Sequence, residues 1–349
     1  MSLREDWIRS RPDFPWLQVD DLAGLRAYLG RAHWLKPGEE VRDCEHAGDG
    51  NMNLTLRVRT DRRSFILKQA RPWVEKYPDI AAPWERSRFE QRFYARVAGI
   101  PGVASRMPEL LGRDPEARVL LLEDLPDAQD LSPLYAEAGR AQIADAEIDE
   151  LAAYLRALHD ATDGPPDPEL ANRDMRALNH SHIYEIPLGP EAPVDLDALE
   201  PGLARTADEL RADAAYRRAV AETGERYLQD GPCLLHGDYF PGSWLRSRHG
   251  LRVIDPEFGF CGDPEFDVGC AAAHLALAGQ EPERALRFLE SYGRALEPRW
   301  VARFAATEVM RRLIGVAQLP IPPSDGFRAE LLDRSRRAMI RERLEELWK

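Results

Sequence analysis

Cysteine is scarce in this sequence, and long apolar runs are absent. The 349 residues include four cysteines, at positions 44, 233, 261 and 270, and none stands in C-x-x-C spacing. This pattern favours neither a zinc site nor a disulfide framework. The opening MSLREDWIRSRPDF lacks the apolar segment of a signal peptide, and the longest apolar run, CAAAHLALAG, is too short to span a bilayer. The sequence therefore predicts a cytoplasmic protein without a membrane partner.

Positive charge is in deficit. The chain has 47 Lys and Arg residues against 60 Asp and Glu residues, a formal net charge of -13. This balance argues against a nucleic-acid partner, whereas one local cationic pocket would still bind a phosphate-bearing small ligand. A G-x-S-x-G elbow is also absent, so a serine hydrolase is not supported. The composition, 44% hydrophobic and 31% charged, is typical of a soluble globular protein.

The first third of the chain has the pattern of an antiparallel meander. After a helical DDLAGLRAYLGRA, the segments VRDCEHA, NLTLRVRT and SFILKQA predict three short strands joined by tight turns. The first turn, GDGN, contains Gly48, Gly50 and Asn51. Its glycines permit a close backbone approach, which would suit a turn that covers nucleotide phosphates. An ordinary hairpin turn is the commoner explanation of these residues.

Lys68 ends the third predicted strand and has a predicted partner. In the helical segment PWERSRFEQRFYARVAG, Glu90 shares one face with Phe93, Tyr94 and Val97. A carboxylate on a core-directed face needs a partner, and Lys68 is the obvious one. Kinases position nucleotide phosphates with such a strand lysine paired to a helix glutamate. The alternative is that both side chains are solvated.

The segment ARVLLLEDLPDA predicts a further strand, which ends at Glu123. If the strand leads into an interdomain hinge, the backbone of Glu123 and Leu125 would bind an adenine edge; an ordinary core strand is the alternative. From about residue 144 the periodicity is helical, with one long helix expected over GLARTADELRADAAYRRAVAETGERYL. We therefore expect an N-terminal lobe, residues 1–125, with helices and a β-meander, and a helical C-terminal lobe, residues 126–349.

Two aspartates, Asp238 in CLLHGD and Asp255 in LRVIDPE, each follow a short apolar strand. A carboxylate in such a place requires a metal, a proton to accept or hydrogen-bond donors. Phosphoryl transfer uses carboxylates to orient the attacking hydroxyl and to bind Mg²⁺. Asp238 suits the base, and Asp255 with Glu257 suits the metal. The order of covering turn, Lys68, Glu90, hinge, Asp238 and Asp255 is the order found in protein kinases.

The segments HGD and VIDPEFGFCGDPEFDVG resemble the aminoglycoside phosphotransferase and choline kinase superfamily, relatives of the protein kinases. Within it the sequence is most similar to methylthioribose kinases, in GDGNMNLTLRV, LKQARPWV with RSRFE, MRALNHSHIYEIPL, the HGD region and EVMRRLIGVAQL. The resemblance implies a bilobal α+β fold of the protein kinase type, with a small antiparallel β N-terminal lobe and a larger, mainly α C-terminal lobe. It also implies ATP and Mg²⁺ as cofactors and a sugar hydroxyl as acceptor.

By the same resemblance, Asp238 is the catalytic base, Asp255 and Glu257 bind Mg²⁺, Lys68 meets the phosphates, and Asp267 ties the catalytic loop in place. The phosphorylated group would be the anomeric oxygen of 5-methylthioribose or a related 5-substituted ribose.

The acceptor side shows both a likeness and a departure. The resemblance assigns Arg311 and Arg312 to the sugar, although the helix alone is also compatible with solvated or snorkelling arginines. Methylthioribose kinases usually carry Leu-His-Thr after HGD, whereas this chain has Tyr239, Phe240 and Pro241. We expect Tyr239 and Phe240 to reshape the wall around the acceptor.

Other functions stay open at this point. A two-metal phosphohydrolase would use the acidic and histidine side chains at 180, 182, 236, 238, 255, 257, 263, 265 and 267, but it leaves Lys68 unexplained. A nucleotide-binding pseudokinase would lack the base or a metal ligand. An aminoglycoside acceptor would suit the negative net charge but not two adjacent arginines. The expected partners are ATP and a small sugar-like acceptor, with a homodimer as the alternative to a monomer.

Overall fold

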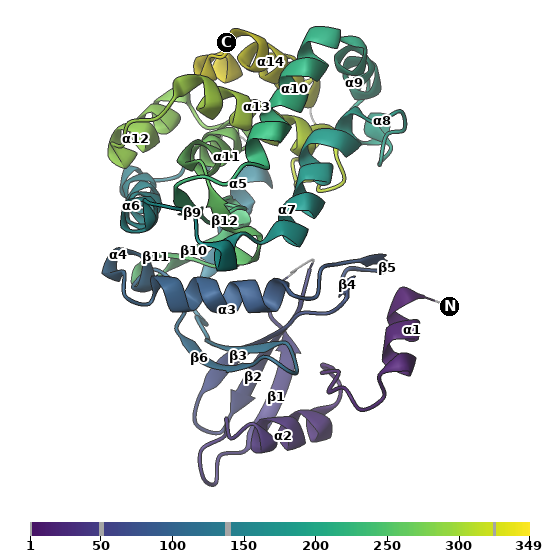
Figure 1. Ribbon diagram of the computed structural model, residues 1–349, viewed down its shortest axis with the longest axis vertical. Helices are drawn as coiled ribbons and strands as arrows, with labels where there is room; N and C mark the ends of the chain where they lie inside the picture. The colour runs from purple at the N-terminus through teal and green to yellow at the C-terminus, as the bar shows by residue number, and fades with distance from the viewer. Residues whose placement is uncertain (1, 49–51, 137–140, 324–325) are drawn as a thin grey trace. The chain divides into compact units, whose positions relative to one another are not determined.

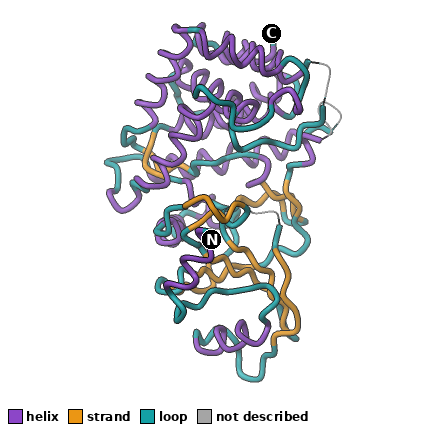
Figure 2. The backbone as a smooth tube through the Cα atoms, turned by 90° about the vertical axis from the view of Figure 1, so that its right-hand side faces the viewer, coloured by secondary structure: helices purple, strands orange, loops and turns teal. Residues whose placement is uncertain are grey.

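The computed structural model describes residues 2–48, 52–136, 141–323 and 326–349. The chain divides into two compact units, one made of residues 1–99 and 107–126 and the other of residues 100–106 and 127–349. Strands predominate in the first unit and helices in the second, as the colours of Figure 2 show. An antiparallel β region followed by a mainly helical region is the predicted α+β class, which is thereby confirmed.

The described residues of the first unit form three longer helices and a set of short strands, labelled in Figure 1. Their bounds are α1 Leu3–Ser10, α2 Leu22–Arg31, β1 Val41–His46, β2 Leu54–Thr60, β3 Ser64–Gln69, β4 Trp73–Val74, β5 Tyr77–Ala81, α3 Arg86–Val97, β6 Leu110–Asp114 and β7 Val119–Glu123.

The second unit is built mainly from helices. Their bounds are α4 Pro101–Ala104, α5 Pro133–Ala136, α6 Asp145–Thr162, α7 Arg173–His180, α8 Leu196–Leu199, α9 Leu203–Ala212, α10 Ala214–Tyr227, α11 Pro264–Leu277, α12 Pro282–Tyr292, α13 Pro298–Ile314 and α14 Phe327–Arg341. Its strands are β8 Gln129–Asp130, β9 Cys233–Leu235, β10 Trp244–Ser247, β11 Gly250–Val253 and β12 Phe260–Gly262.

The main sheet of the first unit has the order β1-β2-β3-β7-β6 in the described residues, and every neighbouring pair is antiparallel. Leu56 on β2 and Leu67 on β3 are paired and fully buried on one face, where they join a core with Leu25 and Leu29 of α2. Because side chains alternate along a strand, Lys68 points to the opposite face from Leu67. The predicted meander is therefore confirmed, and β6 is a strand that the sequence pattern did not predict.

The second unit is centred on α11 and α13, which pack against each other. Every residue of α11 is buried, and α13 is buried from Phe304 to Ile314. A helix buried on all sides belongs to the core of a domain rather than to its surface. Two antiparallel pairs, β9 with β12 and β10 with β11, carry the loops that follow β9 and β11. Asp238 and Asp255 lie on these two loops.

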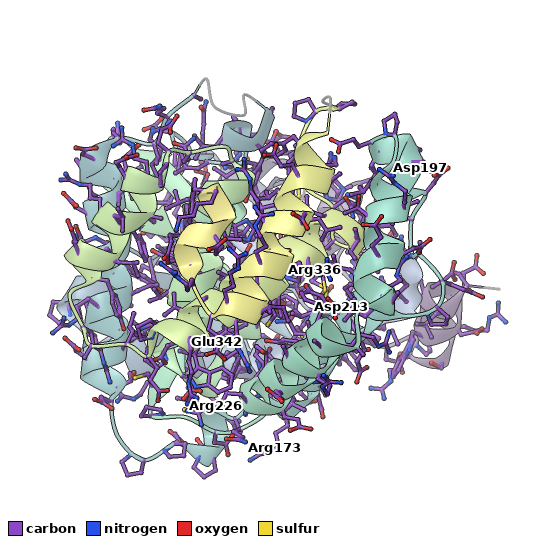
Figure 3. The ribbon with its side chains drawn as sticks, turned by 90° about the horizontal axis from the view of Figure 1, so that it is seen from above. Arg173, Asp197, Asp213, Arg226, Arg336 and Glu342 are labelled. Atoms are coloured by element: carbon purple, nitrogen blue, oxygen red, sulfur yellow. The ribbon has the colours of Figure 1, made fainter. Side chains whose placement is uncertain are left out.

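The single long helix predicted over residues 202–228 is wrong. The structure has two helices there, because α9 ends at Ala212 and α10 begins at Ala214. Asp213 between them has an extended backbone, and its carboxylate accepts hydrogen bonds from the amides of Ala215 and Tyr216. The same carboxylate pairs with Arg336 of α14, and the two labelled side chains lie together in Figure 3. An aspartate that caps a helix start thus interrupts a continuous helical pattern.

None of the helices in the described part of the chain is long and apolar enough to cross a membrane.

Candidate active site

Lys68 and Glu90 form a buried ion pair in the first unit. Lys68 Nζ lies 2.9 Å from Glu90 Oε1, and the two side chains are 4% and 3% exposed. Glu90 is on the buried face of α3 together with Phe93, Tyr94 and Val97, as its spacing predicts. The predicted pairing is therefore confirmed. Because both charges are out of water, each fixes the position of the other, and the ammonium is held at the end of β3.

The turn between β1 and β2 is only partly within the described residues. Gly48 is exposed and has a φ of +71°, a conformation that favours glycine. Gly50 and Asn51, which the sequence predicts to cover phosphates, lie outside the described residues.

The segment after β7 is a candidate for nucleotide contacts. The carboxylate of Glu123 accepts a hydrogen bond from the amide of Glu109, and Asp124 pairs with Arg57 at 3.0 Å. These contacts fix the two acidic side chains. The amide of Leu125 has no hydrogen-bond partner within the described ranges. A backbone donor left unused beside an ordered strand end is compatible with the predicted contact to a base edge.

The loop that carries Asp238 is held in place by hydrogen bonds to Asp267 of α11. One oxygen of Asp267 accepts a hydrogen bond from the His236 amide at 2.7 Å, and the other accepts one from the Gly237 amide at 3.0 Å. His159 of α6 approaches the same carboxylate at 3.3 Å. The tying role that the resemblance implies for Asp267 is confirmed by these contacts.

Gly237 is required by the shape of this loop. Its φ is +84°, and a Cβ at this position would lie 2.1 Å from the carbonyl oxygen of Phe258. Any side chain would therefore push apart the two loops that carry Asp238 and Asp255. The sequence HGD thus has a structural reason for its central glycine.

Asp238 contacts two adjacent arginines of α13, Arg311 and Arg312. Its Oδ1 lies 3.1 Å from Arg311 Nη2 and 3.0 Å from Arg312 Nη2. The Asp238 side chain is 22% exposed, so the carboxylate is open to solvent on one side. The arginines are not solvated or snorkelling side chains, because each is only 6% exposed. The structure thus brings together the predicted base and the predicted acceptor-binding pair.

A buried glutamate, Glu308, holds both arginines from the other side. Its carboxylate accepts hydrogen bonds from Arg311 Nε at 2.5 Å and from Arg312 Nε at 2.9 Å. Burial opposes ionisation of Glu308, but the two guanidinium groups outweigh it and hold its pKa well below the usual range. Two negative and two positive charges therefore balance in this cluster.

Asp255 and Glu257 lie on the loop after β11. Asp255 has a φ of +61°, which is a strained conformation for a residue with a Cβ. Glu257 follows in the 3₁₀ helix Pro256–Phe258 and is buried. No three His, Cys, Asp or Glu side chains form a metal cage in the described ranges. Because Mg²⁺ takes one or two carboxylates together with phosphates and water, this pair suits Mg²⁺ better than zinc.

Tyr239 and Phe240 have different environments. Tyr239 is fully buried, its ring is stacked on Tyr154, and its hydroxyl donates to the carbonyl of Leu151. Phe240 is half-buried, and the guanidinium carbon of Arg312 lies 4.7 Å from the centre of its ring. Phe240 rather than Tyr239 therefore contacts the arginine pair, and an acceptor contact of Tyr239 stays a prediction.

Comparison with known sequences identifies the family. The sequence model described as "Phosphotransferase enzyme family" matches residues 43–304, which include the loops of Asp238 and Asp255 and the first turns of α13. The chain belongs to this phosphotransferase family.

Among curated relatives, a methylthioribose kinase of Exiguobacterium sibiricum is 30% identical over 254 residues, 69% of this chain and 62% of that protein. The chain spans about three fifths of the length of the first curated relatives that it matches. Other curated methylthioribose kinases match over similar lengths.

Solved structures support the fold of this family member. A choline kinase from Streptococcus pneumoniae matches with a TM-score of 0.53 and 14% identity, over 90% of this chain and 98% of that chain. A spectinomycin phosphotransferase in complex with ADP and spectinomycin matches with a TM-score of 0.54 and 12% identity, over 85% and 87%. The kinase-like fold predicted from the resemblance is thereby confirmed.

The two-metal alternative finds no support in the described part of the chain. His180 and His182 do not alternate on an extended strand, because α7 continues into a π-helical turn, Ser181–Glu185. The absence of any three-residue metal cluster within the described ranges also counts against a cage of protein ligands.

Sequence reasoning did not assign a function to Glu308 or to His274 of α11, which contacts it. Glu308 stands three and four residues before the arginines, a spacing that brings side chains together on a helix, so this signal was available. His274 is brought in by the packing of α11 on α13 and has no comparable signal.

Proposed function

We propose that the protein is an ATP-dependent small-molecule kinase. It transfers the γ-phosphoryl group to a sugar hydroxyl, and the acceptor is 5-methylthioribose or a related 5-substituted ribose that is phosphorylated at its anomeric oxygen. The observation that carries the proposal is the contact of both Arg311 and Arg312 with the carboxylate of Asp238. A base and a donor fork in direct contact suit a reaction in which one group binds an acceptor and the other removes its proton.

In the proposed reaction, Asp238 accepts the proton of the acceptor hydroxyl as its oxygen forms the bond to the γ-phosphorus. The bond between that phosphorus and the β,γ-bridging oxygen breaks, and ADP leaves. Lys68, fixed by Glu90, meets the nucleotide phosphates. Asp255 and Glu257 would hold Mg²⁺, which neutralises charge on the phosphates when bound. The backbone amide of Leu125 donates a hydrogen bond to the adenine ring of ATP.

The charge balance around Asp238 supports a neutral acceptor. The carboxylates of Asp238 and Glu308 offset the guanidinium groups of Arg311 and Arg312, so the cluster offers no excess negative charge to a polycation. Two adjacent guanidinium groups, each with one nitrogen not bound to a carboxylate, suit the paired oxygens of a furanose. The likeness to methylthioribose kinases points the same way.

The test is ATP turnover, followed by ADP release, with methylthioribose, ribose, 5-deoxyribose and kanamycin as acceptors. Turnover with a 5-substituted ribose is expected. If kanamycin is phosphorylated and no pentose is, the acceptor assignment is wrong and only the kinase activity survives.

In Arg312→Lys, which keeps the charge but loses the planar set of donors, the KM for the acceptor should rise about tenfold, with the KM for ATP unchanged.

A further inference from the structure

A chain of polar groups runs from Asp238 into the core of the helical unit. Arg311 and Arg312 connect the Asp238 carboxylate to Glu308. Glu308 Oε1 in turn lies 2.8 Å from His274 Nε2 on α11, a contact that joins α11 to α13.

The chain ends at a tyrosine. His274 Nδ1 lies 2.7 Å from the hydroxyl of Tyr135 on α5. Because Glu308, His274 and Tyr135 are each at most 1% exposed, water does not compete for these hydrogen bonds.

The direction of each hydrogen bond follows from the chemistry of the groups. Burial raises the pKa of Tyr135 well above its ordinary value, so its hydroxyl keeps the proton and donates to His274 Nδ1. Burial also lowers the pKa of His274, to about 4, so the ring is neutral and its remaining proton is on Nε2. That proton is donated to Glu308, which is ionised. The His274 tautomer is therefore fixed by its two neighbours.

Each arginine is divided between two carboxylates. The Nε of each is bound to Glu308 and the Nη2 of each to Asp238. Within the described ranges, the Nη1 atom of each arginine has no hydrogen-bond partner. Neither Nη1 atom is among the buried polar atoms that solvent cannot reach. The guanidinium groups are thus fixed along one edge, while one donor of each stays accessible. Such an arrangement presents donors to a ligand without a loss of side-chain entropy on binding.

We propose that Glu308 and His274 are positioning residues, which hold Arg311 and Arg312 in the orientation that binds the acceptor beside Asp238. This inference rests on the proposed kinase function and assigns no contact with substrate to either residue. Phe240 supports the same pair, since its ring lies against Arg312 and 5.4 Å from the ring of His274.

The test compares Glu308→Gln with a matched control, Glu346→Gln. Glu346 is also a buried glutamate with two arginine partners, Arg337 and Arg341, which lie on α14. In Glu308→Gln the KM for the acceptor should rise about tenfold with the KM for ATP unchanged, because a charged hydrogen-bond acceptor is lost. Glu346→Gln should leave both KM values unchanged. An unaltered acceptor KM in folded Glu308→Gln overturns the proposal.

A triple variant separates positioning from general stability. If Glu308 acts through Arg311 and Arg312, the acceptor KM of Glu308→Gln/Arg311→Lys/Arg312→Lys should lie within about twofold of that of Arg311→Lys/Arg312→Lys. If the two effects multiply, Glu308 acts elsewhere and the proposal fails. Should Glu308→Gln not fold, His274→Gln serves in its place, because glutamine keeps one donor for Glu308. A rise of about threefold in acceptor KM is then expected, and no rise contradicts the proposal.

A readout without turnover keeps the test independent of the acceptor. In protein with ¹⁵N-labelled arginine, the Nε protons of Arg311 and Arg312 should exchange slowly with water. They should exchange faster in Glu308→Gln and not in Glu346→Gln; equal exchange in all three proteins contradicts the proposal. If the wild type phosphorylates an aminoglycoside and no pentose, the proposed acceptor is wrong, and the same KM comparison with that acceptor still tests Glu308.

Discussion

Arg312 and Asp238 form an ion pair in which Nη2 lies 3.0 Å from Oδ1, although 74 residues separate them in the chain. The proposed base is therefore not an isolated carboxylate on a loop. A group on α13 determines where it points and shares its charge. Changes at Asp238 should for this reason alter the chemical step and leave nucleotide binding intact.

In Asp238→Asn, kcat should fall by a factor on the order of 10² or more, because the amide cannot accept the proton of the acceptor hydroxyl. The KM for ATP should not change. Steady-state kinetics with the acceptor identified in the turnover screen measures both values. Near-normal kcat in this variant would show that another group is the base.

Asp255→Gly separates backbone strain from metal binding. Glycine adopts a φ of +61° without strain, so the midpoint of thermal unfolding should stay the same or rise. If Asp255 is a ligand, turnover supported by Mg²⁺ should be lost. Asp263→Asn, which removes a carboxylate bound to Arg226 on the same unit, is the control and should keep the wild-type Mg²⁺ requirement. An unchanged Mg²⁺ titration in Asp255→Gly would place the metal elsewhere.

Lys68→Met should weaken nucleotide binding and lower the stability of the first unit. The variant leaves the Glu90 carboxylate buried without its ammonium partner, a change that costs about 3 kcal/mol of stability. The KM for ATP should rise, and the KM for the acceptor should not. Asp43→Asn, which breaks the exposed pair with Arg59 in the same unit, should leave stability nearly unchanged. Equal effects of the two variants on the KM for ATP would contradict the role of Lys68.

The pH dependence of stability should report on His274. The groups that face it are Tyr135 from α5 and Glu308, Arg311 and Arg312 from α13. The folded protein keeps its ring neutral down to a pKa of about 4, whereas the unfolded chain takes up the proton near 6.5. The unfolded state therefore binds more protons in this window, and the free energy of unfolding falls as the pH falls from 6.5 toward 4.

The contribution of one such group is about 1.4 kcal/mol per pH unit. His274→Gln cannot titrate, so its free energy of unfolding should depend less steeply on pH in this window. Denaturant titrations of both proteins at pH 7, 6 and 5 measure the difference. Parallel pH profiles would show that His274 is not held neutral in the wild type.

Local patterns predicted the first half of the site well. The pairing of Lys68 with Glu90 follows from one strand end and one helix face, each of which can be deduced from a few residues. The break at Asp213 was missed although aspartate is a preferred helix cap, because the apolar period continues on both sides of it. Local patterns could not predict the partner of Glu308, since His274 lies on another helix and a whole buried helix has no distinctive face.

The three contacts of Asp267 anchor the loop of Asp238 to the core of the helical unit. Loops usually open in small, independent fluctuations, but the amides of His236 and Gly237 are bonded to a carboxylate on a fully buried helix. These amides are released only when α11 itself moves. The backbone amides beside the proposed base should consequently exchange with solvent as slowly as the most protected amides of the helical unit. The Asp238 carboxylate is thus exposed to solvent, while the backbone that carries it stays protected.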